Sequence, residues 1–123
     1  MYRGVLMDDR LFVYGTLAPG KPNAHVLSGV PGHWENGTVR GRLVQRGWGA
    51  ALGYPGIVPC PQGLVGDEVA GWIFTSPQLP EQWDRLDAFE GSGYQRVTTL
   101  AKRADGSMVP VQIYAITPEQ ESF

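Results

Sequence analysis

The chain has 123 residues, a formal net charge of −2 and one cysteine, Cys60. This length is enough for one domain, residues 1–123, with a hydrophobic core of its own. The ten basic residues form no cluster that would bind nucleic acid, and no apolar stretch approaches the ~18 residues of a membrane span. A single cysteine excludes an intramolecular disulfide, and the first residues lack an apolar run of signal-peptide length, so we expect a soluble, cytoplasmic protein.

The first part of the chain predicts a buried strand that ends in a turn. Seventeen glycines and ten prolines indicate many turns, which favours a sheet-rich fold. Residues 10–14 (RLFVY) form a short apolar run before Gly15, as is typical of a strand buried on both faces. Residues 22–27 predict one short helix.

The middle of the chain predicts a strand and a long loop. Residues 33–46 alternate in polarity only from Thr38 onward, so we expect a strand that begins near Thr38. Asn36-Gly37 is a common turn pair and is expected to form the turn before this strand. Residues 47–63 are rich in glycine and proline and predict an irregular loop with one short extended piece.

The last part of the chain predicts a strand, a helix and a hairpin. Residues 69–75 form a β-prone run, and a helix is expected over residues 80–91. Residues 94–102 and 108–116 flank an Asp-Gly turn, which indicates a closing hairpin, and Pro110 suggests an edge or a bulge there. The chain therefore predicts a mixed α/β fold: a small curled or barrel-like β-sheet with one main helix and a closing hairpin.

Glu90 is unusual because helical spacing places its carboxylate among apolar side chains. The apolar stripe of the predicted helix contains Leu79, Trp83 and Leu86, and Glu90 projects from the middle of that stripe. Burial and the negative end of the helix dipole both raise the pKa of a carboxylate, which suits a general acid/base near neutrality. The alternative is a frayed last turn that leaves Glu90 in solvent.

Two further positions suggest binding. Gly15 directly follows the first strand, and successive backbone N–H groups at such a turn can bind an anion, although a simple turn is the alternative. Tyr94 and Arg96 share one side of the next strand, so one of them is expected to line the space that Glu90 faces. Arg96 is equally plausible as a surface residue, and Asp87 is expected to be solvated.

Other mechanisms have little support in the sequence. Cys60 lies between two prolines in a loop, and neither His25 nor His33 has the local signature of a base for a thiol nucleophile. Two histidines without a neighbouring acidic cluster do not predict a metal site. The sequence also lacks a P-loop or dinucleotide-binding fingerprint.

Four short motifs together resemble the gamma-glutamylcyclotransferase-like family, and most closely its gamma-glutamylamine cyclotransferase branch. In order and spacing, they are LFVYGTL (residues 11–17), GYPGIVP (53–59), LDAFEG (86–91) and GYQR (93–96). The resemblance covers about residues 10–116. It implies a small barrel-like fold with one cavity among these motifs, and release of 5-oxoproline from a small gamma-glutamyl amine or amide without a cofactor or metal.

The resemblance also implies roles for individual residues. The turn formed by Tyr14, Gly15, Thr16 and Leu17 would bind the glutamyl end of the substrate through backbone amides. Glu90 would accept a proton from the alpha-ammonium group and deliver one to the departing amine. The candidate catalytic residue is therefore Glu90, and the candidate substrate-binding residues are Tyr14, Gly15, Thr16, Leu17 and Tyr94.

Three departures from the family pattern affect the expected leaving-group side of the cavity. Relatives commonly have Gly-Glu where this chain has Gly71-Trp72; their Asn-His pair is split here as Asn23-Ala24-His25, and residues 45–52 enlarge a loop. Two alternatives remain for the function. One is a non-catalytic module that binds a small carboxylate metabolite, although a binder of anions gains nothing from a buried Glu90. The other is a related gamma-glutamyl acyl-transfer enzyme of a biosynthetic pathway.

Overall fold

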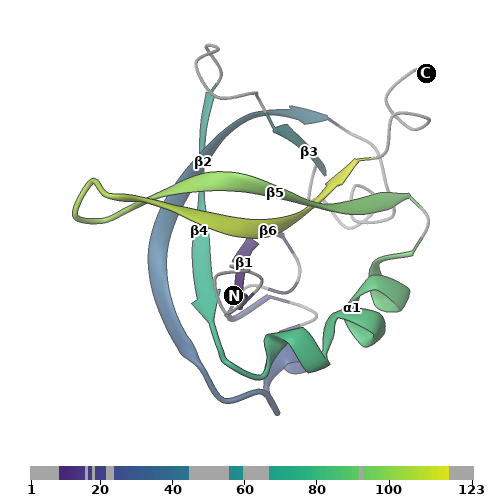
Figure 1. Cartoon of the computed structure of the whole chain (residues 1–123). Coiled ribbons are helices and arrows are strands. Elements are labelled where there is room, and N and C mark those ends of the chain that lie inside the picture. Colours follow the sequence, from purple (N-terminus) through teal and green to yellow (C-terminus); the bar gives the residue numbers. More distant parts are fainter. Residues whose placement is uncertain are drawn as a thin grey trace, which may run out of the picture.

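The computed structural model describes residues 9–15, 17, 19–21, 24–44, 56–59, 67–91 and 93–116. Within these ranges the strands form a six-stranded sheet of order β3-β2-β4-β1-β6-β5. β2 also pairs with β5, so the sheet closes on itself as a barrel, with β3 added on β2 (Figure 1). The expected barrel-like sheet with one main helix and a closing hairpin is confirmed.

The elements follow the predicted order, but β2 begins at His33 and not near Thr38. The predicted short helix over residues 22–27 appears as a short 3-10 helix. The segments predicted as strands at residues 10–14, 69–75, 94–102 and 108–116 all appear as strands. In chain order the elements are β1 (Arg10–Val13), η2 (Ala24–Leu27), β2 (His33–Val44), β3 (Gly56–Pro59), β4 (Asp67–Thr75), η4 (Leu79–Glu81), α1 (Trp83–Glu90), β5 (Tyr94–Arg103) and β6 (Met108–Ile116).

β1 occupies the centre of the sheet, between β4 and β6. It pairs antiparallel with β4, where Val13 lies opposite Trp72, and parallel with β6, where Leu11 lies opposite Gln112. Neighbours on both edges and packing on both faces leave the apolar side chains of β1 almost without solvent contact. The predicted burial of the first strand is therefore confirmed.

The predicted turn at Asn36-Gly37 is wrong, because β2 runs through both residues. Asn36 lies opposite Trp72 of β4, and Gly37 pairs with both Gly71 of β4 and Arg103 of β5. A Cβ atom on Gly37 would lie 2.7 Å from the Ile73 side chain and 3.0 Å from the Lys102 carbonyl oxygen. Glycine is needed here because strands approach closely where the barrel closes.

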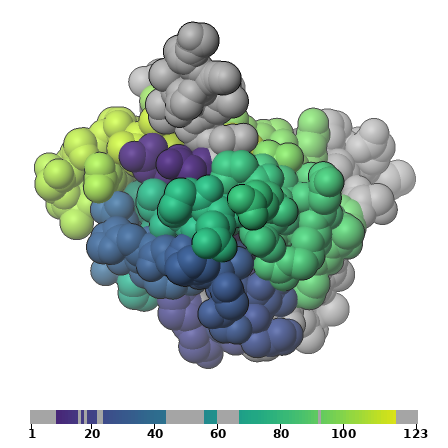
Figure 2. Space-filling view, turned by 60° about the horizontal axis from the view of Figure 1, so that its bottom comes forward, coloured from purple at the N-terminus to yellow at the C-terminus, as the bar shows by residue number. Residues whose placement is uncertain are grey.

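Two apolar clusters stabilise the fold, one inside the barrel and one between the barrel and its helices. The inner cluster draws on all six strands and consists of Phe12, Val39, Ile57, Val69, Ile73, Ala101, Val111 and Ile113. The outer cluster consists of Leu11, Val13, Leu17, Leu27, Val30, Phe74, Leu79, Trp83, Leu86 and Tyr114. The space-filling view shows the η2 and early β2 segments (blue) against the β4-to-α1 segment (teal to green) that covers this outer cluster (Figure 2).

The predicted helix over residues 80–91 is divided into η4 and α1. Pro80 lies at the start of η4, where its missing N–H costs no hydrogen bond. Gly91 ends α1 with a φ of 83°, a conformation that glycine adopts without strain. Trp83 and Leu86 are buried on the inner side of α1, so the predicted apolar stripe is confirmed.

We predict that Gly37→Ala destabilises the protein by about 1–3 kcal/mol, because the added methyl group overlaps a buried side chain and a strand carbonyl. Gly29→Ala is the matched control, since a Cβ at Gly29 meets nothing within 4 Å. The control is expected to change the free energy of unfolding by less than about 0.5 kcal/mol. Urea unfolding of both variants measures the difference, and equal stabilities would contradict the close approach at Gly37.

Candidate functional site

Glu90 is buried at the end of α1. Its side chain lies on the inner side of the helix with Trp83 and Leu86, and the residue is only 8% exposed. Burial raises the pKa of the Glu90 carboxyl to about 7, because the charged form is poorly solvated there. The alternative of a frayed, solvent-exposed Glu90 is therefore wrong.

Tyr14 lies where β1 leaves the barrel and links three segments. Its hydroxyl donates to the Tyr114 carbonyl oxygen at 2.7 Å and accepts from the backbone N–H of Ile57 at 3.2 Å. Burial raises the pKa of the Tyr14 phenol, and the neighbouring Tyr94 and Glu90 raise it further. Two candidate residues, Tyr94 and Glu90, are thus close enough to Tyr14 to interact with it electrostatically.

Asp87 is not simply solvated as expected, because it is the centre of a polar network. Arg96 donates to Asp87 through Nε at 2.9 Å and Nη2 at 3.4 Å, and the Tyr114 hydroxyl donates at 2.6 Å. Burial raises the pKa of Asp87, but the two hydrogen-bond donors and the charge of Arg96 outweigh this and leave the pKa below its usual range. Asp87 is therefore ionised at neutral pH.

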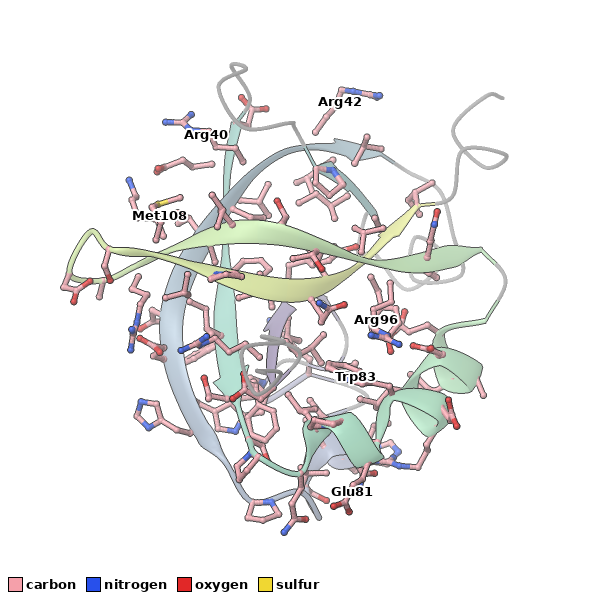
Figure 3. The ribbon with its side chains drawn as sticks, in the orientation of Figure 1. Arg40, Arg42, Glu81, Trp83, Arg96 and Met108 are labelled. Atoms are coloured by element: carbon pink, nitrogen blue, oxygen red, sulfur yellow. The ribbon has the colours of Figure 1, made fainter. Side chains whose placement is uncertain are left out.

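Arg96 is held on several sides and is not a free surface residue. Its guanidinium lies 4.5 Å from the centre of the Trp83 ring and donates to Gln112 Oε1 at 3.2 Å. Figure 3 shows Arg96 and Trp83 facing each other between α1 and the β5–β6 hairpin. Gln112 in turn donates to Thr98 Oγ1 at 2.8 Å, so the network extends along the hairpin.

The turn after β1 is described in part. Gly15 is half-buried there, and Leu17 is buried in the outer cluster, which also contains Leu86 and Trp83 of α1. Thr16 lies outside the described residues. The described part of the turn is thus next to the helix that carries Glu90.

Several other predicted positions lie outside the described residues or apart from the site. Cys60, Asn23 and residues 45–55 are outside them, whereas His25 and His33 are exposed on η2 and β2. Across the described ranges, His, Cys, Asp and Glu side chains nowhere gather in a group of three or more that could hold a metal ion. In the same part of the chain, every helix is too short or too polar to span a membrane.

Sequence reasoning missed Tyr114 and Gln112 as members of the network. Both lie on β6, and the pattern of residues 108–116 predicts only a strand. Gln112 is 8% exposed, and a polar residue in the middle of a buried strand signals a required hydrogen-bond partner. That signal was available from the sequence, although the identity of the partner was not.

The closed barrel with one helix and an added strand has the gamma-glutamylcyclotransferase-like fold. Residues 11–122 match the family described as gamma-glutamyl cyclotransferase, AIG2-like, so the chain belongs to this family. Comparison of the sequence with curated proteins gives no significant match.

Solved structures show the same fold at low sequence identity. An AIG2-like protein from Mus musculus is 25% identical, with a TM-score of 0.65 over 92% of this chain and 82% of that protein. YkqA from Bacillus subtilis is 23% identical, with a TM-score of 0.63 over 90% of this chain but only 36% of that protein. A structure named gamma-glutamyl cyclotransferase is 18% identical, with a TM-score of 0.63 over 88% of this chain and 66% of that protein.

We predict that Glu90→Gln raises the free energy of unfolding at pH 8. At pH 5 this stabilising effect is expected to be much smaller or absent. The folded-state pKa of about 7 lies above the ordinary value of 4.5, so the folded protein binds this proton more tightly than the unfolded chain does. The free energy of unfolding therefore falls as pH rises from about 4.5 to 7, by up to about 3 kcal/mol. A glutamine side chain carries no charge that has to be desolvated. We therefore expect the free energy of unfolding of Glu90→Gln to exceed that of the wild type by on the order of 1 kcal/mol at pH 8.

Urea unfolding at pH 5 and pH 8 measures this difference for the wild type and for Glu90→Gln. Glu81→Gln is the control, because Glu81 is exposed on η4 and points away from the barrel (Figure 3). A Glu90→Gln effect that is the same at both pH values would contradict a raised pKa.

Proposed function

We propose that the protein is a gamma-glutamyl cyclotransferase that releases 5-oxoproline from a small gamma-glutamyl amine or amide. The observation that carries this proposal is the buried Glu90 carboxyl, with a pKa of about 7, beside the tyrosine that begins the turn after β1. Family membership and the structural neighbour named gamma-glutamyl cyclotransferase support it. In this proposal the substrate is a small molecule and the enzyme acts in the cytoplasm.

Glu90 acts as the general acid/base in this proposal. The ionised carboxylate accepts a proton from the alpha-ammonium group of the substrate, and the freed amine attacks the gamma-carbonyl carbon. The tetrahedral intermediate then collapses: the bond from the carbonyl carbon to the leaving nitrogen breaks, and the protonated Glu90 delivers its proton to that nitrogen. The attacking nitrogen still carries one proton too many for the lactam and releases it to the departing amine. The products are therefore 5-oxoproline and an ammonium ion, and Glu90 returns to its ionised state.

A pKa near 7 suits both halves of this sequence. At neutral pH a substantial fraction of Glu90 is ionised and can act as a base, and the protonated form that results is a competent acid. A carboxyl at its ordinary pKa of 4.5 would be a weaker base. Burial at the end of α1 is therefore the feature that adapts Glu90 to this chemistry.

The turn after β1 is the proposed binding site for the glutamyl end of the substrate. In our proposal the backbone N–H groups from Gly15 to Leu17 bind the substrate and stabilise the developing oxyanion. Tyr14 supports the turn, because its hydroxyl is held by Ile57 on β3 and by Tyr114 on β6. In the same proposal Tyr94 lines the space that the substrate occupies; its electrostatic effect on Tyr14 supports this. Ring closure is intramolecular, so correct positioning supplies much of the rate acceleration.

We predict that Glu90→Gln lowers 5-oxoproline release by about 10²-fold or more, because proton transfer by a positioned side chain contributes about that much. In the wild type, kcat/KM is expected to fall as pH drops below about 7, where Glu90 becomes protonated. Release of 5-oxoproline over a panel of gamma-glutamyl amines and dipeptides is the assay. Calorimetric binding of 5-oxoproline and thermal melting show whether the variant still folds and binds.

A folded Glu90→Gln variant with wild-type turnover would remove Glu90 from the mechanism. A wild type that binds 5-oxoproline but releases none from any member of the panel would favour the non-catalytic binding module instead.

Trp72 is the proposed determinant of the leaving amine. Trp72 is half-buried on β4 and lies opposite Val13, the residue that precedes Tyr14. Its ring meets that of Trp34 edge-on, with ring centres 6.3 Å apart. Both tryptophans pack against the outer cluster that contains Leu17. We propose that this aromatic pair contacts the amine portion of the substrate and favours an apolar group there.

We predict that the wild type prefers a gamma-glutamyl amide of an aromatic amine over one of a lysine side chain, and that Trp72→Glu reverses this preference. The physical reason is that an indole face compensates the desolvation of an ammonium group much less than a carboxylate does. The ratio of kcat/KM values for the two substrates is the measurement. Equal ratios in the wild type and in Trp72→Glu would show that Trp72 has no part in selection.

A further inference from the structure

Tyr114 contacts both halves of the proposed site from β6. Its side-chain hydroxyl donates to Asp87 Oδ1 on α1 at 2.6 Å. Its backbone carbonyl oxygen accepts from the Tyr14 hydroxyl, at the end of β1, at 2.7 Å. Asp87 precedes Glu90 by one turn of α1, and Tyr14 immediately precedes Gly15. Tyr114 therefore lies between the helix with the acid/base and the strand end with the binding turn.

The end of α1 depends on contacts outside the helix. α1 has 8 residues and no side-chain hydrogen bond at its N-cap, and isolated helices shorter than about 12 residues are marginal in water. Glu90 is the last residue of α1, and Gly91 follows it. The position of an acid/base at this end of the helix therefore depends on how the preceding turn is anchored to the barrel.

Asp87 supplies a fixed anchor for that turn. Its carboxylate receives two hydrogen bonds from Arg96, which itself stacks on Trp83 and is bound by Gln112. Trp83 begins α1 and Asp87 lies in its second turn, so the network attaches the start and the middle of the helix to the β5–β6 hairpin. The hydroxyl of Tyr114 adds a third hydrogen bond to Asp87, and the backbone of the same residue binds Tyr14.

We propose that Tyr114 is a positioning residue that sets the separation between Glu90 and the turn at Gly15. It does so through Asp87 on one side and Tyr14 on the other, without contact to the substrate. The inference rests on the proposed cyclotransferase function and deepens it, because it names the residue that holds the acid/base in register with the bound substrate.

The proposed reaction is sensitive to this separation. The carboxyl of Glu90 has to reach the alpha-amine and then the leaving nitrogen of one bound substrate. A displacement of about 1 Å in such an arrangement lowers the rate by about 10²-fold, whereas binding through a backbone turn is little affected. Loss of the Tyr114 hydroxyl should therefore act on kcat and leave KM nearly unchanged.

The test is Tyr114→Phe, which removes the hydroxyl but keeps the ring and the carbonyl that binds Tyr14. We expect kcat for 5-oxoproline release to fall about 10- to 100-fold, with KM within about threefold of the wild type. Arg103→Gln is the matched control, because it removes a polar contact of 3.0 Å, to Glu35, between β5 and β2. Wild-type kcat is expected for this control.

A second measurement does not depend on turnover. In protein labelled with ¹³C at glutamate carboxyls, the resonance lost in Glu90→Gln identifies Glu90, and its titration is followed in the wild type and in Tyr114→Phe. We expect the pKa of Glu90 to move in the variant from near 7 toward 4.5, because a loosened helix end admits water. Should Tyr114→Phe fail to fold, Asp87→Asn replaces it in both measurements, because it weakens the same hydrogen bond from the other side.

Each outcome decides the proposal. A lower kcat together with a lowered pKa of Glu90 supports positioning by Tyr114. An unchanged pKa and an unchanged kcat overturn it, as does a loss confined to KM, which would mean that Tyr114 acts on substrate binding. If the wild type releases no 5-oxoproline, the proposed function fails, and the titration of Glu90 alone decides whether Tyr114 holds that carboxyl in place.

Discussion

The pairing of β2 with both β4 and β5 is the constraint on which the arrangement of this molecule depends. It closes the sheet and makes room for an inner apolar cluster drawn from every strand. In the same sheet β1 and β6 pair directly, with β4 and β5 on their outer edges. The residues at the ends of these two strands, Tyr14 and Tyr114, can then meet although their positions in the chain are far apart. The candidate site thus depends on the order of the strands in the barrel.

Two of the three carboxylates of α1, Asp87 and Glu90, show how surroundings give one kind of group two roles. Asp87 faces Arg96 and the Tyr114 hydroxyl, which stabilise its charge, so it stays ionised and serves as an anchor. Glu90, one turn later, lies in a buried environment that disfavours its charge and brings its pKa to about 7. Separation of pKa values within one site is common where acid/base chemistry occurs. Burial of Glu90 weakens the folded state at neutral pH, and the polar network fastens the same helix to the barrel.

The sequence was sufficient for the features that depend on local periodicity. The buried first strand, the closing hairpin and the apolar stripe with Glu90 in its middle all follow from the spacing of apolar residues. The turn predicted at Asn36-Gly37 failed because the same glycine signal that marks a turn also marks a close approach of strands. The roles of Asp87 and Tyr114 could not be predicted, because they depend on how α1 lies against the β5–β6 hairpin. That placement follows from the closure of the barrel and leaves no local pattern in the chain.

The parallel contact between β1 and β6 has a consequence for how the protein folds. The hydrogen bond from Tyr14 to Tyr114 joins residues 100 positions apart, and β1 needs β6 for its second edge. Contacts of such long range form late, because the entropy lost in closing the intervening loop is recovered only when they are made. On the ribosome, β1 emerges first and has to wait for the last strand before its edge is covered. The site between these strands is therefore complete only when folding is complete, and catalytic competence in a folding experiment would report the last step of assembly.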